Sequence, residues 1–443
     1  MSFDCLDFIS DLQWADIPNA SKRTLLRSVL DTVGVASVGR QTDMGRITAD
    51  YARQHWAAGP QGPKARMMFD GGIVAPAGAA FAGAFAIDSI DAHDGHSPVK
   101  GHAGSGVFPA LVAIAQTMEM TGEDFLTAMA VGYEVSYRAG LSQHATCADY
   151  HTSGAWTAVG VAAMGARLLG LTPEQTRHAM GIAEYHGPRS QMMRCIDHPS
   201  MVRDGVGWGA PTGVTAVYMA QAGFTGAPAI TVEQNDVAQF WQGLGDVWEI
   251  DRTHYKRYPV CRWAHPAIDA VADMMTDHNL DSSQIQAVQI NTFHNATRLA
   301  GQSPETTDEI AYGIAFPTAI MMVRGKIGLT ELSAAVLEDP EIRRISMATT
   351  MHETEVYNAK ADLGERWADV TLNLFNGARI KSKAYQPKGD PDLPLSDKEI
   401  SEKFHGFAGS VVGKKRATTI ETCVADLAQL PDIGPFLDLI CEP

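Results

Sequence analysis

One stretch of twelve residues concentrates side chains that could move protons or bind an anion. It holds three histidines, two aspartates and a lysine, namely Asp91, His93, Asp94, His96, Lys100 and His102. An imidazole with its ordinary pKa of about 6.5 can act as a base at neutral pH. So many titratable residues make a poor core and are typical of a pocket wall, although a solvated polar loop is the alternative. We expect Asp94, His96 and Lys100 to bind the substrate.

The same stretch could instead bind a metal ion. Four of its residues are chemically competent ligands: His93, Asp94, His96 and His102. Their spacing matches no H-E-x-x-H pattern or similar template. We therefore predict no metal and no other cofactor, and we keep a metal-dependent hydrolase as the alternative from a different class.

A second polar group spans residues 255–265. Lys256 and two arginines lie there beside aromatic residues, and His265 ends the group. Arginine and lysine bind carboxylates, and arginine can do so through two parallel hydrogen bonds. A basic surface patch is the alternative. With Lys100 and Arg203, Lys256 is a candidate to hold a carboxylate of the substrate.

Two isolated residues are further candidates. His151 precedes a predicted helix and could act as a base, and Tyr312 lies in an otherwise apolar helical segment. A single residue of this kind is more often a hydrogen-bonded structural member than a catalyst.

The elements that must position these residues fall into two groups. Before about residue 264, apolar residues recur at helical spacing, as in the segments 108–120, 125–137, 155–169 and 209–222. The uncharged Ala/Gly run 71–87 predicts a tightly packed buried helix, and Thr172-Pro173 is a strong helix start.

The spacing of the apolar residues changes in the second half of the chain. Period-two alternation over 287–293 and 367–383 predicts strands, with helices over 311–323 and 329–337 between them. Ser396 and Glu399 form a capping box that opens a last helical region, which we expect to pack back on the first helices. We predict a mainly α fold: a large, discontinuous all-helical domain (1–265), a smaller α+β lid domain (266–395) and C-terminal helices (396–443).

Composition excludes several classes of protein. The 443 residues are 45% hydrophobic and 19% charged, which argues against a disordered or fibrous chain. The net charge of −16 argues against nucleic acid or an anionic membrane as partner, so an anionic substrate must meet local cations. Six scattered cysteines, acidic residues at the N-terminus and an uncharged run too short to span a membrane predict a cytoplasmic protein with reduced thiols.

Taken together, these stretches resemble the MmgE/PrpD family along essentially the whole chain. The order and spacing of the motifs carry the resemblance: Asp91-x-x-Asp94, Gly101-His102, Tyr150-His151, Val202-Arg203-Asp204-Gly205, Lys256-x-Tyr258-Pro259-x-Cys261-x-x-x-His265, Tyr312, Asp390-Pro391 and Pro394-Leu395-Ser396-Asp397-Lys398-Glu399. The family contains 2-methylcitrate dehydratase, cis-aconitate decarboxylase and iminodisuccinate epimerase. The resemblance implies a large all-helical domain, a smaller α+β lid, usually a homodimer with an active site between the domains, and chemistry without an organic cofactor.

The resemblance also implies site residues. Four residues fall on positions similar to active-site positions of the decarboxylase branch: Asp91, His102, His151 and Tyr312. His265 falls on the family's histidine after the Tyr-Pro motif, and Arg203 stands where that branch has a lysine. Because arginine stays protonated, Arg203 can hold a carboxylate but cannot readily exchange a proton.

These positions suggest a mechanism on a small polycarboxylate. His102 or His151 removes a proton from a carbon beside a carboxylate, Asp91 orients a histidine, and Tyr312 protonates the departing group. Loss of hydroxide, as in 2-methylcitrate dehydratase, is the outcome we expect. Epimerisation of an iminodisuccinate-like acid, decarboxylation of a cis-aconitate-type acid and ligand binding without catalysis are the alternatives.

Overall fold

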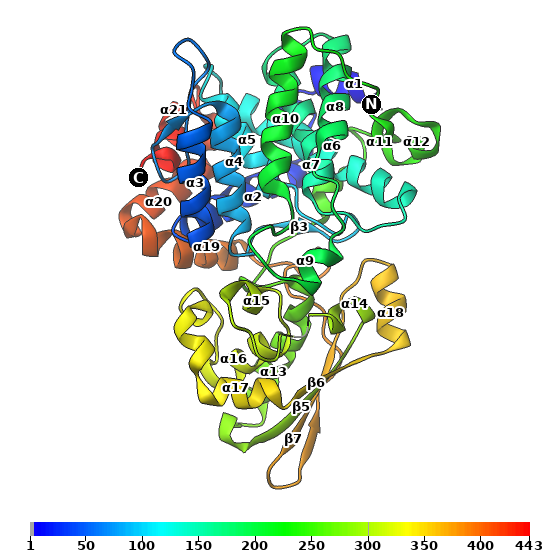
Figure 1. Cartoon of the computed structure of the whole chain (residues 1–443), viewed down its shortest axis with the longest axis vertical. Helices are drawn as coiled ribbons and strands as arrows, with labels where there is room; N and C mark the ends of the chain where they lie inside the picture. The colour runs from blue at the N-terminus through cyan, green and yellow to red at the C-terminus, as the bar shows by residue number, and fades with distance from the viewer. Residues whose placement is uncertain (1–3, 300) are drawn as a thin grey trace.

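The computed structural model describes residues 4–299 and 301–443, and most of them are helical. Two bodies are stacked end to end, with mainly helices and two very short strand pairs in the upper one and helices beside a larger sheet in the lower one (Figure 1). The prediction of a mainly α fold with a smaller α+β part is confirmed. We call the upper body the helical domain and the lower one the lid domain.

Two separate parts of the chain form the helical domain. The first part contains α1 (Cys5–Asp11), α2 (Asn19–Gly39), α3 (Asp43–His55), α4 (Pro76–Asp88), α5 (Gly104–Ala115), α6 (Gly122–Thr146), α7 (Gly154–Leu168), α8 (Pro173–His186), α10 (Val206–Gln221), α11 (Ile230–Glu233) and α12 (Ala238–Trp241). The second contains α19 (Asp397–Val411), α20 (Gly413–Ala425) and α21 (Gly434–Cys441). These last helices lie beside α2 and α3 (Figure 1), and a Cβ on Gly34 of α2 would be 3.1 Å from the Phe404 ring of α19.

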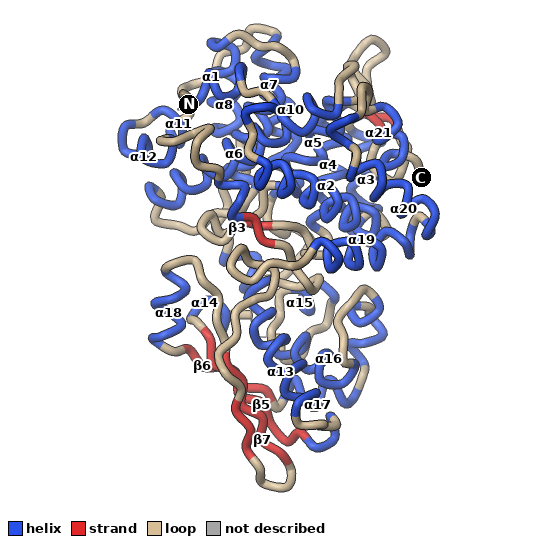
Figure 2. Tube along the Cα trace, turned by 180° about the vertical axis from the view of Figure 1, so that it is seen from behind, coloured by secondary structure: helices blue, strands red, loops and turns tan. Residues whose placement is uncertain are grey.

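The short α9 (Met193–Asp197) lies where the two bodies meet (Figure 1), and the lid domain begins at residue 265, after α12 of the helical domain. Its helices are α13 (His265–Asp277), α14 (His294–Thr297), α15 (Thr307–Ala311), α16 (Ala315–Arg324), α17 (Pro340–Met347) and α18 (Glu355–Asp362). Its strands are β5 (Ile285–Thr292), β6 (Thr349–Glu353), β7 (Asp369–Leu374) and β8 (Arg379–Lys381). They form one sheet of order β6-β5-β7-β8, visible at the lower end of Figure 2, in which only β5 and β6 run parallel.

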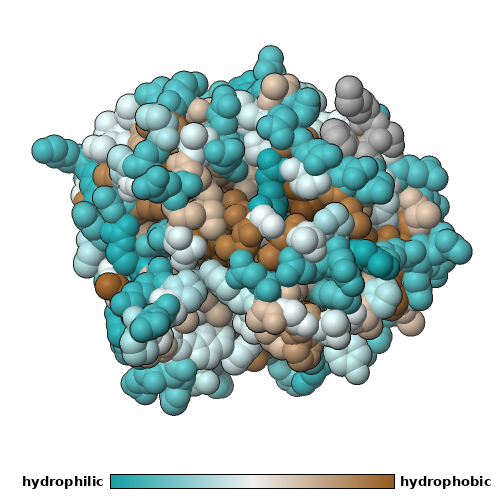
Figure 3. All heavy atoms as spheres, turned by 90° about the horizontal axis from the view of Figure 1, so that it is seen from above, coloured by the Kyte–Doolittle hydropathy of each residue, from teal (hydrophilic) through white to brown (hydrophobic). Residues whose placement is uncertain are grey.

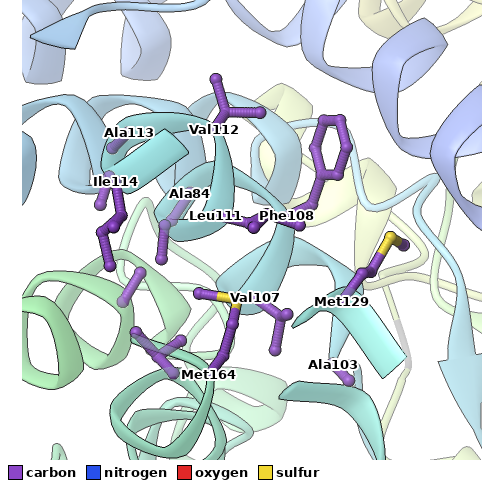
Figure 4. Close-up of a cluster of buried hydrophobic side chains, with 14 of the residues drawn as sticks. Ala84, Ala103, Val107, Phe108, Leu111, Val112, Ala113, Ile114, Met129 and Met164 are labelled. Carbon is purple, nitrogen blue, oxygen red and sulfur yellow. The ribbon is translucent and has the colours of Figure 1, made fainter. Parts of the chain in front are cut away.

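Small residues explain how the helices of the helical domain approach one another so closely. A Cβ on Gly83 of α4 would lie 2.7 Å from Pro109 of α5. In the core around α5, Val107 and Leu111 lie among side chains from neighbouring helices, such as Met164 of α7 (Figure 4). The Ala/Gly run therefore builds a buried helix, as expected, and no helix in the described ranges is long and apolar enough to cross a bilayer.

The capping motifs are formed as predicted, but one predicted helix is absent. Thr172 caps α8, and Ser396 shares reciprocal hydrogen bonds with Glu399 at the start of α19. The segment predicted as a helix over 329–337 instead forms two short 3-10 turns, Thr330–Leu332 and Ala334–Glu338. The period-two segment 367–383 is two strands, β7 and β8, joined by a turn.

A very short sheet joins the two polar stretches of the sequence. Strand β3 (Gly95–His96) pairs with β4 (Thr253–His254), while β1 (Ala65–Arg66) and β2 (Ile73–Val74) form a separate pair. Because Gly95 is paired with His254, the loop 91–102 and the segment 255–265 meet at one place.

Seen from above, the far end of the helical domain shows a central band of hydrophobic side chains surrounded by hydrophilic ones (Figure 3).

Candidate active site

A pocket lies where the helical domain meets the lid domain. Six predicted site residues line it, namely Asp91, His96, Lys100, His102, Lys256 and Tyr312. The other four, Asp94, His151, Arg203 and His265, do not line it. The volume of this pocket is about 50 Å³, which is room for a few water molecules.

His102 is held so that one ring nitrogen is left for chemistry. Its backbone N–H donates to Ser153 Oγ (2.9 Å), and its Nδ1 bonds the backbone carbonyl of Asp94. Since a carbonyl only accepts, Nδ1 carries the proton, and Nε2 keeps its lone pair. Gly101 makes this placement possible, because a Cβ there would lie 2.2 Å from Ser153 Oγ. Burial holds the pKa of His102 well below its ordinary value, and the neighbouring His93 and the Lys256 ammonium lower it further.

Asp91 and Lys256 form a buried ion pair beside this histidine. Both residues are less than 5% exposed, and the Lys256 ammonium donates to the Asp91 carboxylate and to its backbone carbonyl (3.0 Å). A buried pair of this kind is stable only while both partners are present. Lys256 is thus already occupied by a carboxylate of the protein itself.

Two buried carboxylates, Asp88 and Asp204, hold the residues around His102 in place through hydrogen bonds. Asp88 accepts from His93 Nε2 (3.0 Å) and from the backbone N–H of Asp204 (3.2 Å), while Asp204 accepts from the Ser153 hydroxyl. Burial, followed by the charge of Asp88, raises the pKa of Asp204. These bonds fix Ser153 and, through it, the backbone at His102.

Tyr312 presents a phenol to the pocket from the C-terminal end of α15. Burial, then the negative charge of Asp91, raises its pKa, so its hydroxyl stays protonated at neutral pH. The Arg203 guanidinium lies 5.3 Å from the centre of the Tyr312 ring and also binds Asp308 and the Ser89 carbonyl (2.8 Å). Arg203 therefore packs against Tyr312 from outside the pocket, where it lines a neighbouring cavity of about 330 Å³.

Comparison with known proteins matches both bodies of the structure. Residues 4–246 match the MmgE/PrpD N-terminal domain, and residues 258–429 match the MmgE/PrpD C-terminal domain. The chain belongs to the MmgE/PrpD family.

Relatives from fungi and mammals are similar over nearly their full length. Cis-aconitate decarboxylase of Aspergillus terreus is 25% identical, over 98% of this chain and 94% of its own. A cis-aconitate decarboxylase-like protein of Aspergillus oryzae is 24% identical (98% and 96%), and human cis-aconitate decarboxylase is 22% identical (94% and 89%). Decarboxylases are lyases, and the prediction that this family member is an enzyme, a lyase or an isomerase, is confirmed.

Two of the predicted histidines of this MmgE/PrpD protein lie outside the pocket lining. The Nδ1 of His151 bonds the backbone carbonyl of Asp149 (2.8 Å) at the surface of the domain junction. His265 is fully buried at the start of α13, where its Nε2 lies 3.2 Å from the Val260 carbonyl. Of the histidines predicted as bases, the structure therefore brings only His102 into the pocket.

The predicted substrate-binding residues Asp94 and His96 have partners within the protein. Asp94 accepts from the Tyr133 hydroxyl (2.8 Å), and burial raises its pKa to about 6. His96 stacks on Tyr137, its Nε2 bonds Glu249 (3.0 Å), and its Nδ1 accepts from the Val99 N–H (3.2 Å). Both side chains hold the loop in shape and leave few groups for a ligand.

The sequence did not single out two other residues of the pocket. His254 follows from the pairing of β3 with β4, is 4% exposed, and its buried Nε2 has no partner in the described ranges. Arg366, between α18 and β7, reaches the pocket from the lid. His254 stands two residues before Lys256, which is a usable signal, whereas nothing near Arg366 in the sequence indicates its role.

The predicted set of metal ligands is not brought together. Within the described ranges, donor atoms that could share one ion come from Asp91, His93 and His102, all within 4.8 Å of one another. Asp94 and His96 point to other partners. The Lys256 ammonium already neutralises the Asp91 carboxylate, so the arrangement suits proton transfer better than a divalent cation.

Proposed function

We propose that this protein is a lyase that removes a proton from a carbon beside a carboxylate of a small polycarboxylate, without a cofactor, with His102 as the base. The observation that carries the proposal is the geometry of His102. Its Nδ1 is held by a backbone carbonyl, its Nε2 has no partner in the described part of the chain, and cations surround it. This is the arrangement of a general base next to an anion site.

The low pKa of His102 suits an anionic substrate. Before a substrate binds, the low pKa keeps the His102 imidazole neutral at neutral pH, so it can accept a proton as soon as the substrate arrives. Carboxylates placed beside it stabilise the imidazolium and raise its pKa towards neutrality, which increases its strength as a base. Negative charge that develops on the substrate then faces the Lys256 ammonium.

Dehydration is the outcome we place first. The C–H electron pair forms the new double bond, the C–O bond breaks towards oxygen, and the protonated Tyr312 supplies a proton so that water leaves. 2-Methylcitrate is the model substrate. Tyr312 then regains a proton from solvent, and the His102 imidazolium releases the proton it took, which restores both groups.

Decarboxylation is the second candidate, because the relatives named above are cis-aconitate decarboxylases similar over nearly the whole chain. In that reaction the C–CO₂ bond breaks, its electron pair stays on carbon, and a protonated group of the pocket supplies the proton.

One experiment separates these outcomes. The protein is incubated with 2-methylcitrate, citrate, cis-aconitate or iminodisuccinate in deuterated water, and the mixtures are followed by NMR. Loss of water, loss of carbon dioxide and inversion give different products, and deuterium enters the substrate even where no net product accumulates. Absence of both exchange and product with all four acids would refute the proposal.

A further inference from the structure

Arg366 is a buried arginine with one edge of its guanidinium unused. The residue is 5% exposed, and its Nη1 donates to the backbone carbonyls of Ala361 (3.1 Å) and Glu365 (2.9 Å). Its Nε is buried without an acceptor, and no carboxylate in the described ranges forms an ion pair with it. The guanidinium packs against the Phe293 ring, 5.2 Å from its centre, but a buried positive charge without an anionic partner is costly, so the Nε–Nη2 edge indicates that an anion belongs there.

Two other arginines show what fills this edge. Arg262, also in the pocket wall, binds both oxygens of Asp390, with Nε 2.9 Å from Oδ1. Arg344 in the lid gives its Nε and Nη2 to Glu341, both at 2.8 Å, and donates to backbone carbonyls as Arg366 does. A carboxylate is thus the partner that this edge takes elsewhere in the chain.

Lys100 is a second unpaired cation, and it faces the pocket from the helical domain. Its ammonium lies 5.7 Å from the ring centre of Tyr150, and no carboxylate in the described ranges pairs with it. The loops that carry the two cations touch, because a Cβ on Gly364 would lie 3.7 Å from the backbone oxygen of Ser97. Lys100 and Arg366 are therefore carried on loops that touch across the boundary between the domains, and both side chains line the same pocket.

The electrostatics of the pair agree with this geometry. Burial, and then the charge of Arg262, lowers the pKa of Arg366 to about 10. Burial, and then the charge of Arg366, lowers the pKa of Lys100. An anion bound between these cations would remove the repulsion.

We propose that a carboxylate of the substrate binds the Nε–Nη2 edge of Arg366, with Lys100 as the second cation, and that this contact ties the lid to the helical domain. The inference rests on the proposed polycarboxylate substrate and adds where one carboxylate is held. It moves the carboxylate site away from Lys256 and Arg203, which already bind Asp91 and Asp308.

The test measures binding of citrate and tricarballylate to the full chain by titration calorimetry. Arg366→Gln removes the charge and the fork, and we expect at least a tenfold weaker Kd. Arg366→Lys keeps the charge but loses the fork, so its Kd should lie between those of Arg366→Gln and the wild type. Arg344→Gln is the matched control, since its edge is filled by Glu341, and its Kd should stay within twofold of wild type.

The outcomes separate the two proposals. Melting temperatures show whether each variant is folded, and a folded Arg366→Gln that binds both acids as tightly as the wild type overturns the role of Arg366. If Arg366→Gln loses binding while the wild type shows no proton exchange in the NMR experiment, the carboxylate site stands and the proposal of a lyase is refuted. If the wild type binds neither acid, both proposals fail.

Discussion

The two walls of the pocket differ in whether their buried cations have carboxylate partners within the chain. On the wall of the helical domain and the adjoining β4 segment, the buried Lys256 is paired with Asp91, and the ring of His93 is hydrogen-bonded to Asp88. On the lid wall, Arg366 has no carboxylate partner in the described ranges. The Asp91–Lys256 pair is therefore complete before a ligand binds, whereas Arg366, together with the unpaired Lys100 of the helical domain, gains its anionic partner from the ligand.

Strained backbone conformations at the predicted site residues also occur on the wall of the helical domain. Only five non-glycine residues in the described ranges have positive φ, and three of them are predicted site residues: Asp91 (49°), Lys100 (57°) and Arg203 (46°). Such a conformation costs about 1–3 kcal/mol and persists only where the surroundings impose it. All three belong to the helical domain, which positions its groups rigidly.

The largest expected effect comes from the wall of the helical domain, which we call the rigid wall, and it is a loss of catalytic rate. Replacing His102 with Asn removes the base, and α-proton exchange should fall roughly 10²–10⁴-fold. The binding of citrate should change little, because the cations remain. The exchange rate by NMR and the Kd by calorimetry check this pair of expectations, and near-normal turnover would exclude His102 from the mechanism.

The second prediction contrasts the matched and unmatched cations directly. Lys256→Met leaves the Asp91 carboxylate buried without its partner, and we expect the free energy of unfolding to drop by about 3–5 kcal/mol. Adding Asp91→Asn should recover part of this loss, because the unpaired charge is then gone. Urea unfolding measures both variants.

Arg366→Gln in the same urea experiment should lose far less stability than Lys256→Met, because no carboxylate is left unpaired. An equal loss in both variants would mean that the two walls are built alike.

The third prediction concerns pH and the histidines of the rigid wall. Burial holds the pKa of His254 well below its ordinary value in the folded chain. Below about pH 6.5 the unfolded chain binds a proton that the folded chain does not, so stability falls as the pH falls. His254→Asn should reduce this slope by up to about 1.4 kcal/mol per pH unit.

The slope is obtained from urea unfolding between pH 5 and 6.5, so a constant loss of packing in the variant does not affect it. His352→Asn, at an exposed position of the lid, is the control. An unchanged slope in His254→Asn would show that this imidazole is not kept neutral by the fold.

Local patterns predicted much of the fold because their causes are local. The Ala/Gly run produced α4, and the capping residues Thr172 and Ser396 began α8 and α19 where expected. Strand β6 was missed because its parallel partner β5 lies about sixty residues earlier, and its own sequence, Thr349–Glu353, has little apolar alternation. The segment 329–337 has helical apolar spacing, but it folds into 3-10 turns.

The candidate site was predictable only where its residues cluster in the sequence. The dense stretch around His102 and the cations near Lys256 were found, and both reach the pocket. The Asp91–Lys256 pair joins positions 165 residues apart, so local pattern could not reveal that this lysine is already occupied. Arg366 stands alone in its stretch, and only the meeting of the two domains makes it part of a site.

The smallest expected effect concerns Arg203, which connects the two walls. The sequence suggested a clamp for a carboxylate, which would act mainly on KM. The guanidinium instead lies against the Tyr312 ring and binds Asp308. We therefore expect Arg203→Lys to act through the tyrosine.

A lysine keeps the charge but loses the planar stacking, worth about 1 kcal/mol, so kcat should fall several-fold while KM stays nearly constant. The double variant Arg203→Lys/Tyr312→Phe should then be no slower than Tyr312→Phe alone, because the arginine acts only by positioning the phenol. Steady-state kinetics on the substrate identified by NMR decide the matter. A rise in KM with unchanged kcat would return Arg203 to the role of a carboxylate clamp and would place a matched cation of the rigid wall in direct contact with the substrate.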